Sequence, residues 1–150
     1  MITTISWPHA FQELAQLLPG CQNFLPDEIA EAAAKAGYLS QFIPLHEWET
    51  MTDDDIFQRI MPAKQDVFET ILIVTDASFI KAGPFLLQIG DLLEFAKLHI
   101  AQFKENVFNG DVVIVLGANK KIVLFHHSGF YTLLNFGQIA TQETSNRQAE

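Results

Sequence analysis

Two apolar runs in the second half of the sequence are separated by only four residues. Asp111 to Leu116 is rich in β-branched residues, Lys121 to His127 contains the apolar run Ile122 to Phe125, and Gly117 to Lys120 lies between them. So short a connection permits only antiparallel pairing, because a parallel crossover needs about a dozen residues or more. The sequence therefore predicts a β-hairpin, and with it an antiparallel sheet, in this half of the chain.

Further segments extend the predicted sheet. Phe68 to Thr75 is rich in β-branched residues, whereas Phe85 to Ile89 and Tyr131 to Phe136 are shorter apolar segments beside glycine turns. Residues 91 to 109 repeat apolar side chains at helical spacing, and Asp91 is placed to cap the N-terminus of this helix. This pattern predicts one helix packed on the sheet.

The first half of the sequence reads as short helices. Ser6 is placed to cap a helix that Pro19-Gly20 ends, and Pro26 opens a second helix that ends at Gly37. Tyr38 to Trp48 is apolar but irregular and is expected to be a loop, after which Thr52 caps a third, short helix. Helices followed by strands indicate an α+β fold, with N-terminal helices, a mainly antiparallel sheet and one packed helix.

The length of 150 residues suits one domain, residues 1–150, in which the polar tail 141–150 is expected to fray. The N-terminal residues lack the charged and apolar regions of a signal peptide. The apolar runs are much shorter than the roughly 20 residues of a membrane helix. We therefore expect a cytoplasmic protein without a membrane partner.

The charge of the chain is strongly uneven. Eighteen acidic and nine basic residues give a net charge of −9, and nearly all of the excess lies in residues 1–69. Direct binding of nucleic acid is therefore not expected, because that binding is driven by Lys and Arg that neutralise phosphates. A basic protein partner is expected instead.

The segment from Glu47 to Glu69 contains seven acids and Trp48. Dense negative charge beside an aromatic side chain is typical of a surface that docks a basic protein. The predicted partner-binding residues are Glu47, Trp48, Glu49, Asp53, Asp54, Asp55, Asp66 and Glu69. Charge reversal at Asp53 to Asp55 is expected to weaken binding and leave folding intact. Helix capping and solubility alone remain an alternative explanation for these three acids.

No motif for catalysis, cofactor binding or metal binding is evident. We therefore expect a protein that is not an enzyme and that needs no cofactor and no metal ion. Phosphate-binding glycine loops and a serine nucleophile elbow are absent from the sequence. His126 and His127 are adjacent in a predicted strand, where neighbouring side chains point to opposite faces, so they are not expected to bind one metal ion. His99 lies on an apolar helix stripe and is expected to be a hydrogen-bonded core residue.

Two stretches resemble a known group of proteins. Phe108 to Val115, followed by Lys121 to Tyr131, resembles the C-terminal part of bacterial polymorphic-toxin immunity proteins of the contact-dependent growth inhibition type. The resemblance covers an Asn-Gly-Asp turn, a hairpin, and aromatic and His residues before a glycine turn. It implies a small cytoplasmic protein that binds and neutralises one cognate toxin domain, often a nuclease.

Two other functions remain open from the sequence. One alternative is a subunit or adaptor of a larger assembly, which would use a similar surface to bind a partner that is not a toxin. The other is a small hydrolase that uses His127 together with an acid.

Overall fold

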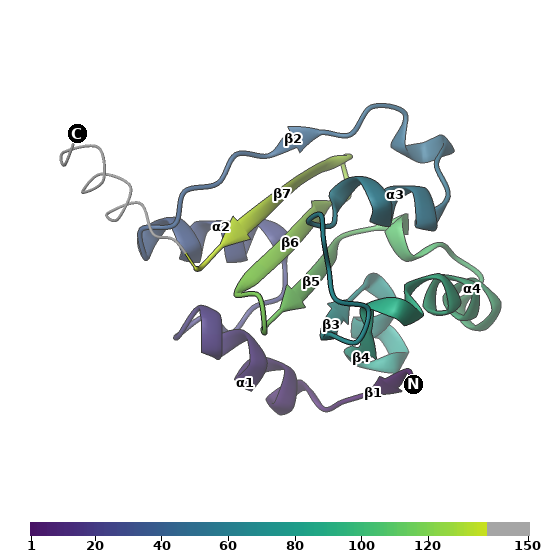
Figure 1. Ribbon diagram of the computed structural model, residues 1–150, viewed down its shortest axis with the longest axis horizontal. Helices are drawn as coiled ribbons and strands as arrows, with labels where there is room; N and C mark the ends of the chain where they lie inside the picture. Colours follow the sequence, from purple (N-terminus) through teal and green to yellow (C-terminus); the bar gives the residue numbers. More distant parts are fainter. Residues whose placement is uncertain (138–150) are drawn as a thin grey trace.

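A sheet of seven strands runs through the middle of the molecule and carries helices on both faces (Figure 1). The computed structural model describes residues 1–137, so the tail 141–150 lies outside the described residues. The strands are β1 (Thr3–Thr4), β2 (Ile43–Pro44), β3 (Thr70–Val74), β4 (Phe85–Gln88), β5 (Val112–Leu116), β6 (Lys121–His126) and β7 (Phe130–Asn135). The α-helices are α1 (Trp7–Leu17), α2 (Pro26–Lys35), α3 (Asp53–Ile60) and α4 (Leu92–Phe103).

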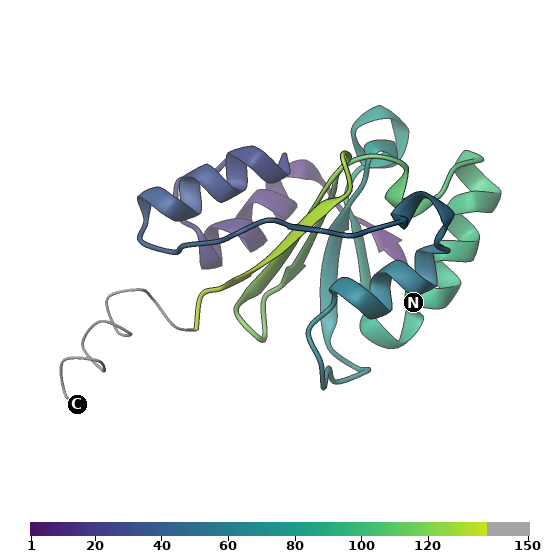
Figure 2. The ribbon, with the colours of Figure 1, turned by 90° about the horizontal axis from the view of Figure 1, so that it is seen from above.

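All neighbouring strands are antiparallel, in the order β1-β4-β3-β5-β6-β7-β2. The hairpin is confirmed, with Val112 opposite Phe125 and Leu116 opposite Lys121. The α+β class is confirmed as well. The helical cover is larger than the single packed helix that we expected, because α1 and α2 lie on one face of the sheet and α3 and α4 on the other (Figure 2).

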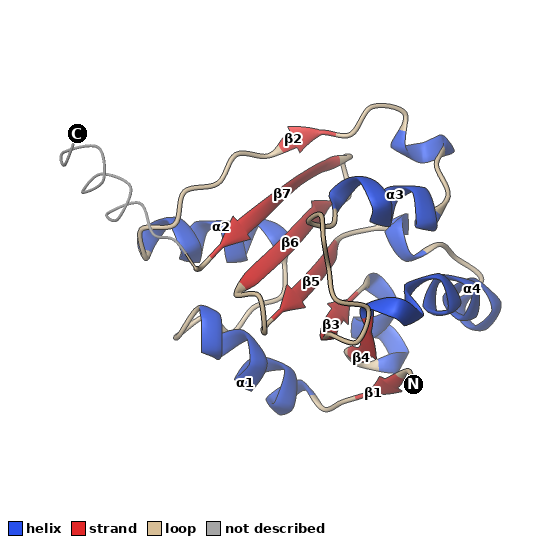
Figure 3. Cartoon of the chain, viewed as in Figure 1, coloured by secondary structure: helices blue, strands red, loops and turns tan. Residues whose placement is uncertain are grey.

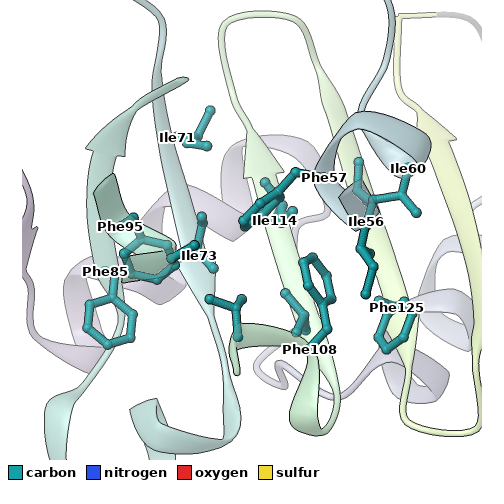
Figure 4. Close-up of a cluster of buried hydrophobic side chains, with 14 of the residues drawn as sticks. Ile56, Phe57, Ile60, Ile71, Ile73, Phe85, Phe95, Phe108, Ile114 and Phe125 are labelled. Atoms are coloured by element: carbon teal, nitrogen blue, oxygen red, sulfur yellow. The ribbon is translucent and has the colours of Figure 1, made fainter. Parts of the chain in front are cut away.

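The central strands explain why both faces are covered. Every residue of β5 is buried. Val113 and Val115 join the core beneath α1 and α2, whereas Ile114 joins the core beneath α3 and α4 (Figure 4). A strand that is apolar on both sides needs a layer of helices on each.

The N-terminal caps of two helices follow the sequence. The Ser6 hydroxyl accepts a hydrogen bond from the His9 backbone N–H at 3.2 Å, and the Thr52 hydroxyl accepts one from Asp55 at 3.1 Å. Asp91 occupies the N-cap position of α4, as expected, but its carboxylate accepts no capping hydrogen bond and instead contacts the N-terminal amino group at 2.9 Å. Helix α4 also ends at Phe103, well before residue 109.

The segment after α2 crosses the sheet edge as a strap, defined here as residues 38–51 (Figure 3). We expected a loop, and most of the strap is one, but β2 pairs with β7 and the Leu45 N–H donates to the Gly129 carbonyl at 2.8 Å. The strap ends in a 3₁₀ turn, η1 (Trp48–Thr50). Strands β1 and β2 were both missed, since two residues show no periodicity.

The strap is also held by close packing of Trp48 on Gly129. Gly129 has a φ of 89°, and a Cβ there would overlap the Trp48 indole. We expect Gly129→Ala to lower the free energy of unfolding by about 1–3 kcal/mol, because the left-handed backbone and the overlap both disfavour a side chain. Urea unfolding followed by circular dichroism measures it. Gly117→Ala is the control, since nothing lies within 4 Å of a Cβ there; equal losses in both variants would contradict the packing argument.

Candidate protein-binding surface

The predicted acidic segment covers η1, α3 and the turn that precedes β3. Its eight predicted binding residues differ in exposure. The exposed ones are Glu47, Glu49, Asp55 and Asp66, the partly buried ones Trp48 and Asp54, and the buried ones Asp53 and Glu69. Only part of the predicted set is therefore accessible to a partner.

Asp53 has a structural position. It is 4% exposed, and its carboxylate accepts hydrogen bonds from the backbone N–H groups of Val107 at 2.9 Å and Phe108 at 3.2 Å. These residues belong to the 3₁₀ turn η4 (Val107–Asn109). Asp53 therefore ties α3 to η4 and is not available to a partner in this conformation. This corrects our expectation that charge reversal at Asp53 leaves folding intact.

Trp48 does not stand free as an anchor. Its ring packs edge-on against Phe125 with centroids 5.4 Å apart, and its indole covers Gly129. One edge remains accessible and, with Glu49, lines a hollow of about 170 Å³ beside the first turn of α3. Asn106 and Asn109 line the other side of this hollow, and sequence reasoning had not singled them out.

Glu69 is the last residue of the same segment. Its Oε1 accepts a hydrogen bond from the Asn119 amide at 2.5 Å, whereas its buried Oε2 has no partner among residues 1–137. Burial raises the pKa of this carboxyl, and the nearby charge of Asp66 raises it further, against smaller opposing effects of Lys121 and Asn119. The fold therefore buries the Glu69 carboxylate where its negative charge is poorly solvated, which disfavours the ionised form.

A groove of about 310 Å³ runs between α3 and the start of α4. We call it the α3–α4 groove, and it is lined by Asp54, Phe57, Gln58, Met61, Gln65, Ile89, Gly90, Leu92 and Leu93. Most of its walls are apolar, Asp54 stands at its rim, and 49% of Leu93 is exposed. The groove therefore combines an apolar surface with negative charge.

Two exposed apolar residues continue this surface. Val67 is 53% exposed, and its carbonyl accepts a hydrogen bond from the Gly90 N–H of the groove at 2.8 Å. Phe68, the next residue, is 74% exposed. We had placed Phe68 in a buried strand, but β3 begins only at Thr70 because Asp66 closes a turn through its side chain, which accepts from the Phe68 N–H at 2.9 Å. An Asx turn at Asp66 was the signal that the sequence offered.

A second group of polar residues lies where β5 begins and β6 ends. The rings of His126 and His127 stack with centroids 4.1 Å apart. Asp111 Oδ1 is 2.8 Å from both the backbone N and the ring Nδ1 of His127. Our argument that the two imidazoles point to opposite faces was wrong, because β6 ends at His126 and His127 already belongs to the turn. Asp111, His126 and His127 each offer a donor atom, and these atoms lie within 4.8 Å of one another.

The carboxylates around this group repel one another. Burial raises the pKa of Asp76, and the charges of Asp111 and Glu105 raise it further, against smaller effects of His127 and of a backbone hydrogen bond from Asp111. Asp111 contacts His127 through Nδ1, which leaves Nε2 without a contact to Asp111. An imidazole nitrogen is a common metal ligand.

Two further side chains with reactive groups, His99 and Cys21, are part of the core. His99 is 3% exposed, its Nδ1 lies 2.9 Å from the Glu105 carbonyl and its Nε2 lies 3.1 Å from the Thr75 hydroxyl. This confirms the prediction of a hydrogen-bonded core histidine. Cys21 is buried, and burial raises the pKa of its thiol, which disfavours the reactive thiolate.

Within residues 1–137, no helix combines the length and the apolar composition needed to cross a bilayer. Comparisons of the chain with protein families, with curated proteins and with solved structures found no match.

The role of Asp53 is testable by amide substitution. We expect Asp53→Asn to lower the free energy of unfolding by about 1–3 kcal/mol, because one of the two buried N–H groups loses its acceptor. Urea unfolding at pH 7 measures the change. Asp55→Asn is the control, since the Asp55 side chain is exposed; equal stability of the two variants would argue against the tie between α3 and η4.

The raised pKa of Glu69 predicts a pH-dependent stability. A carboxyl whose pKa is raised by folding destabilises the folded state once it ionises, so this cost is absent below its ordinary pKa of 4.5 and present above the raised value. We therefore expect Glu69→Gln to raise the urea midpoint at pH 7 and to leave it unchanged at pH 3.5. Glu49→Gln, at an exposed position, should change neither. A lower midpoint for Glu69→Gln at pH 7 would contradict the assignment.

Proposed function

We propose that this chain is an immunity protein that binds and neutralises a cognate toxin domain, of nuclease type, in the cytoplasm. It acts by occupying a surface of the toxin and performs no reaction itself. The observation that carries the proposal is the α3–α4 groove, a mainly apolar surface that one carboxylate, Asp54, also lines, with the exposed Leu93 in its wall.

The apolar side chains support a docking role. Leu93, in the groove wall, is 49% exposed, Val67, bonded to Gly90 of the groove, is 53% exposed, and Phe68, the next residue in the chain, is 74% exposed. A large exposed aromatic side chain next to a hollow is the usual anchor of a protein–protein interface, because burying it contributes a large part of the binding energy. Basic side chains of a partner would then meet the surrounding acids.

The charge of the segment supports a basic partner. Residues 47–69 contain seven acids and two bases. A nuclease surface is positively charged because it binds phosphates, so an acidic surface is complementary to it and also speeds the encounter. Asp54 lines the groove, and the exposed Asp66 accepts a hydrogen bond from the Phe68 N–H at 2.9 Å, so we assign both carboxylates to the docking surface.

The proposed docking surface differs from the predicted set of binding residues. Asp53 and Glu69 are left out because they are buried, and Val67, Phe68 and Leu93 are added because they are exposed. Glu47, Glu49 and Asp55 remain as surrounding charge that attracts the partner. Such peripheral charges affect the association rate more than the dissociation rate.

The first experiment identifies the partner. The tagged protein is purified from its native cells at about 50 mM and 300 mM salt, and proteins that accompany it in equal amount are identified by mass spectrometry. We expect a single basic protein whose capture falls with salt, which kills cells when expressed alone and is harmless when both proteins are co-expressed. A stoichiometric partner that is not toxic would instead support a subunit or adaptor.

The second experiment locates the surface. We expect Phe68→Asp and Asp54→Lys each to weaken binding of that partner at least tenfold in titration calorimetry, because they remove an anchor and a complementary charge. Ile80→Asp, at a position that is 70% exposed, and Glu28→Lys on α2 are matched controls away from the groove. Loss of toxin rescue only with the groove variants would support the docking surface. Unchanged affinity in both groove variants would rule it out.

A further inference from the structure

The start of β5 and the end of β6 bring three metal-binding side chains together. Val112 pairs with Phe125, so Asp111 lies across from His126 on the neighbouring strand. His127 follows in the turn, and its ring lies against that of His126 instead of on the opposite face. The strands are part of the rigid sheet, whereas the turn lets the second imidazole approach the first.

We propose that Asp111, His126 and His127 bind a divalent metal ion of the zinc, nickel and copper group. Two imidazoles and one carboxylate are the donor set that these ions prefer, whereas calcium and magnesium prefer oxygen atoms alone. The three donor atoms lie within 4.8 Å of one another. Donor atoms around one zinc ion are roughly 3.3 Å apart, given metal–ligand distances of about 2.0–2.1 Å. To close the difference, the side chains must move, and the His127 ring must exchange its Nδ1 contact with Asp111 Oδ1 for a shared ion.

The donors are already oriented by hydrogen bonds. Asp111 Oδ1 accepts the His127 backbone N–H at 2.8 Å, which fixes the carboxylate beside the turn. The Ser128 N–H donates to His126 Nδ1 at 3.1 Å. The exposed His127 ring, with 60% of its side-chain surface accessible, is the donor that is freest to rotate toward an ion.

The surrounding charge favours a cation. Asp27 Oδ2 lies 3.4 Å from His126 Nε2, and the Asp76 carboxylate lies against Gly110, next to Asp111. Carboxylates around histidine ligands orient the rings and increase the affinity of the site for metal. A divalent ion would also offset the repulsion among these acids.

With three protein donors, at least one coordination position of the ion remains open. A structural zinc site closes its coordination with four protein ligands, whereas a site with three holds water or a donor from another molecule. Because His127 is exposed, this open position would face solvent. The site lies apart from the α3–α4 groove and does not depend on the proposed function.

Metal titration of the untagged, chelator-treated protein tests the site. We expect calorimetry with Zn²⁺ to give one ion per chain, and Co²⁺ to give visible absorption bands typical of four- or five-fold coordination. His127→Ala and Asp111→Asn should each weaken Zn²⁺ binding at least tenfold and remove the Co²⁺ bands. His46→Ala, at an exposed position of the strap, is the control and should leave both unchanged.

Folding of each variant is checked by thermal unfolding without metal. Zn²⁺ should raise the unfolding temperature of the wild type and of His46→Ala, since a ligand of the folded state stabilises it, and should not raise that of the His127 and Asp111 variants. The proposal is overturned if Zn²⁺ shows no saturable binding up to about 1 mM. Equal affinity of the wild type and the two site variants would overturn it as well.

Discussion

Burial of β3, β5 and β6 on both faces is the constraint on which the rest of the structure depends. Ile71 and Ile73 point toward α3 and α4, whereas Leu72 and Val74 point toward α1 and α2, and β5 and β6 repeat this alternation. Neither face of such a strand tolerates water, so both helical layers are required. The exposed surfaces that we propose as binding sites lie where these layers end.

The position of each candidate site follows from that arrangement. The α3–α4 groove lies where two helices on one face of the sheet diverge around Phe57 and Leu92. The group of Asp111, His126 and His127 lies where β5 begins and β6 ends, outside the alternation of the two strands. Asp53 connects the two regions, because it holds η4, the turn that leads into β5, against α3. Buried contacts therefore set the geometry of both exposed sites.

Periodicity and capping made much of the fold predictable from the sequence. The hairpin, the caps at Ser6 and Thr52 and the core position of His99 follow from local patterns. Patterns that depend on distant partners were not predictable. The two-residue edge strands, the contact of Asp91 with the N-terminal amino group and the bonds of Asp53 to η4 each join residues far apart in the chain.

The candidate sites were predictable in charge but not in geometry. The sequence shows which segment is rich in acids, yet it does not separate the buried Asp53 and Glu69 from their exposed neighbours. Phe68 and His127 were both misplaced for one reason, since each lies one or two residues beyond the end of a real strand. A strand boundary decides whether a side chain enters the core or remains at the surface.

The sheet edges have a consequence for the order in which the chain folds. Strand β1 pairs with β4 and β2 pairs with β7, so both edges join the first third of the chain to segments made much later. During synthesis the N-terminal residues leave the ribosome first. Helices α1 and α2 then have no sheet to cover until β5 and β6 have followed. The acid-rich N-terminal half is thus made before the sheet that it covers, and mutual repulsion of its charges opposes aggregation in that interval.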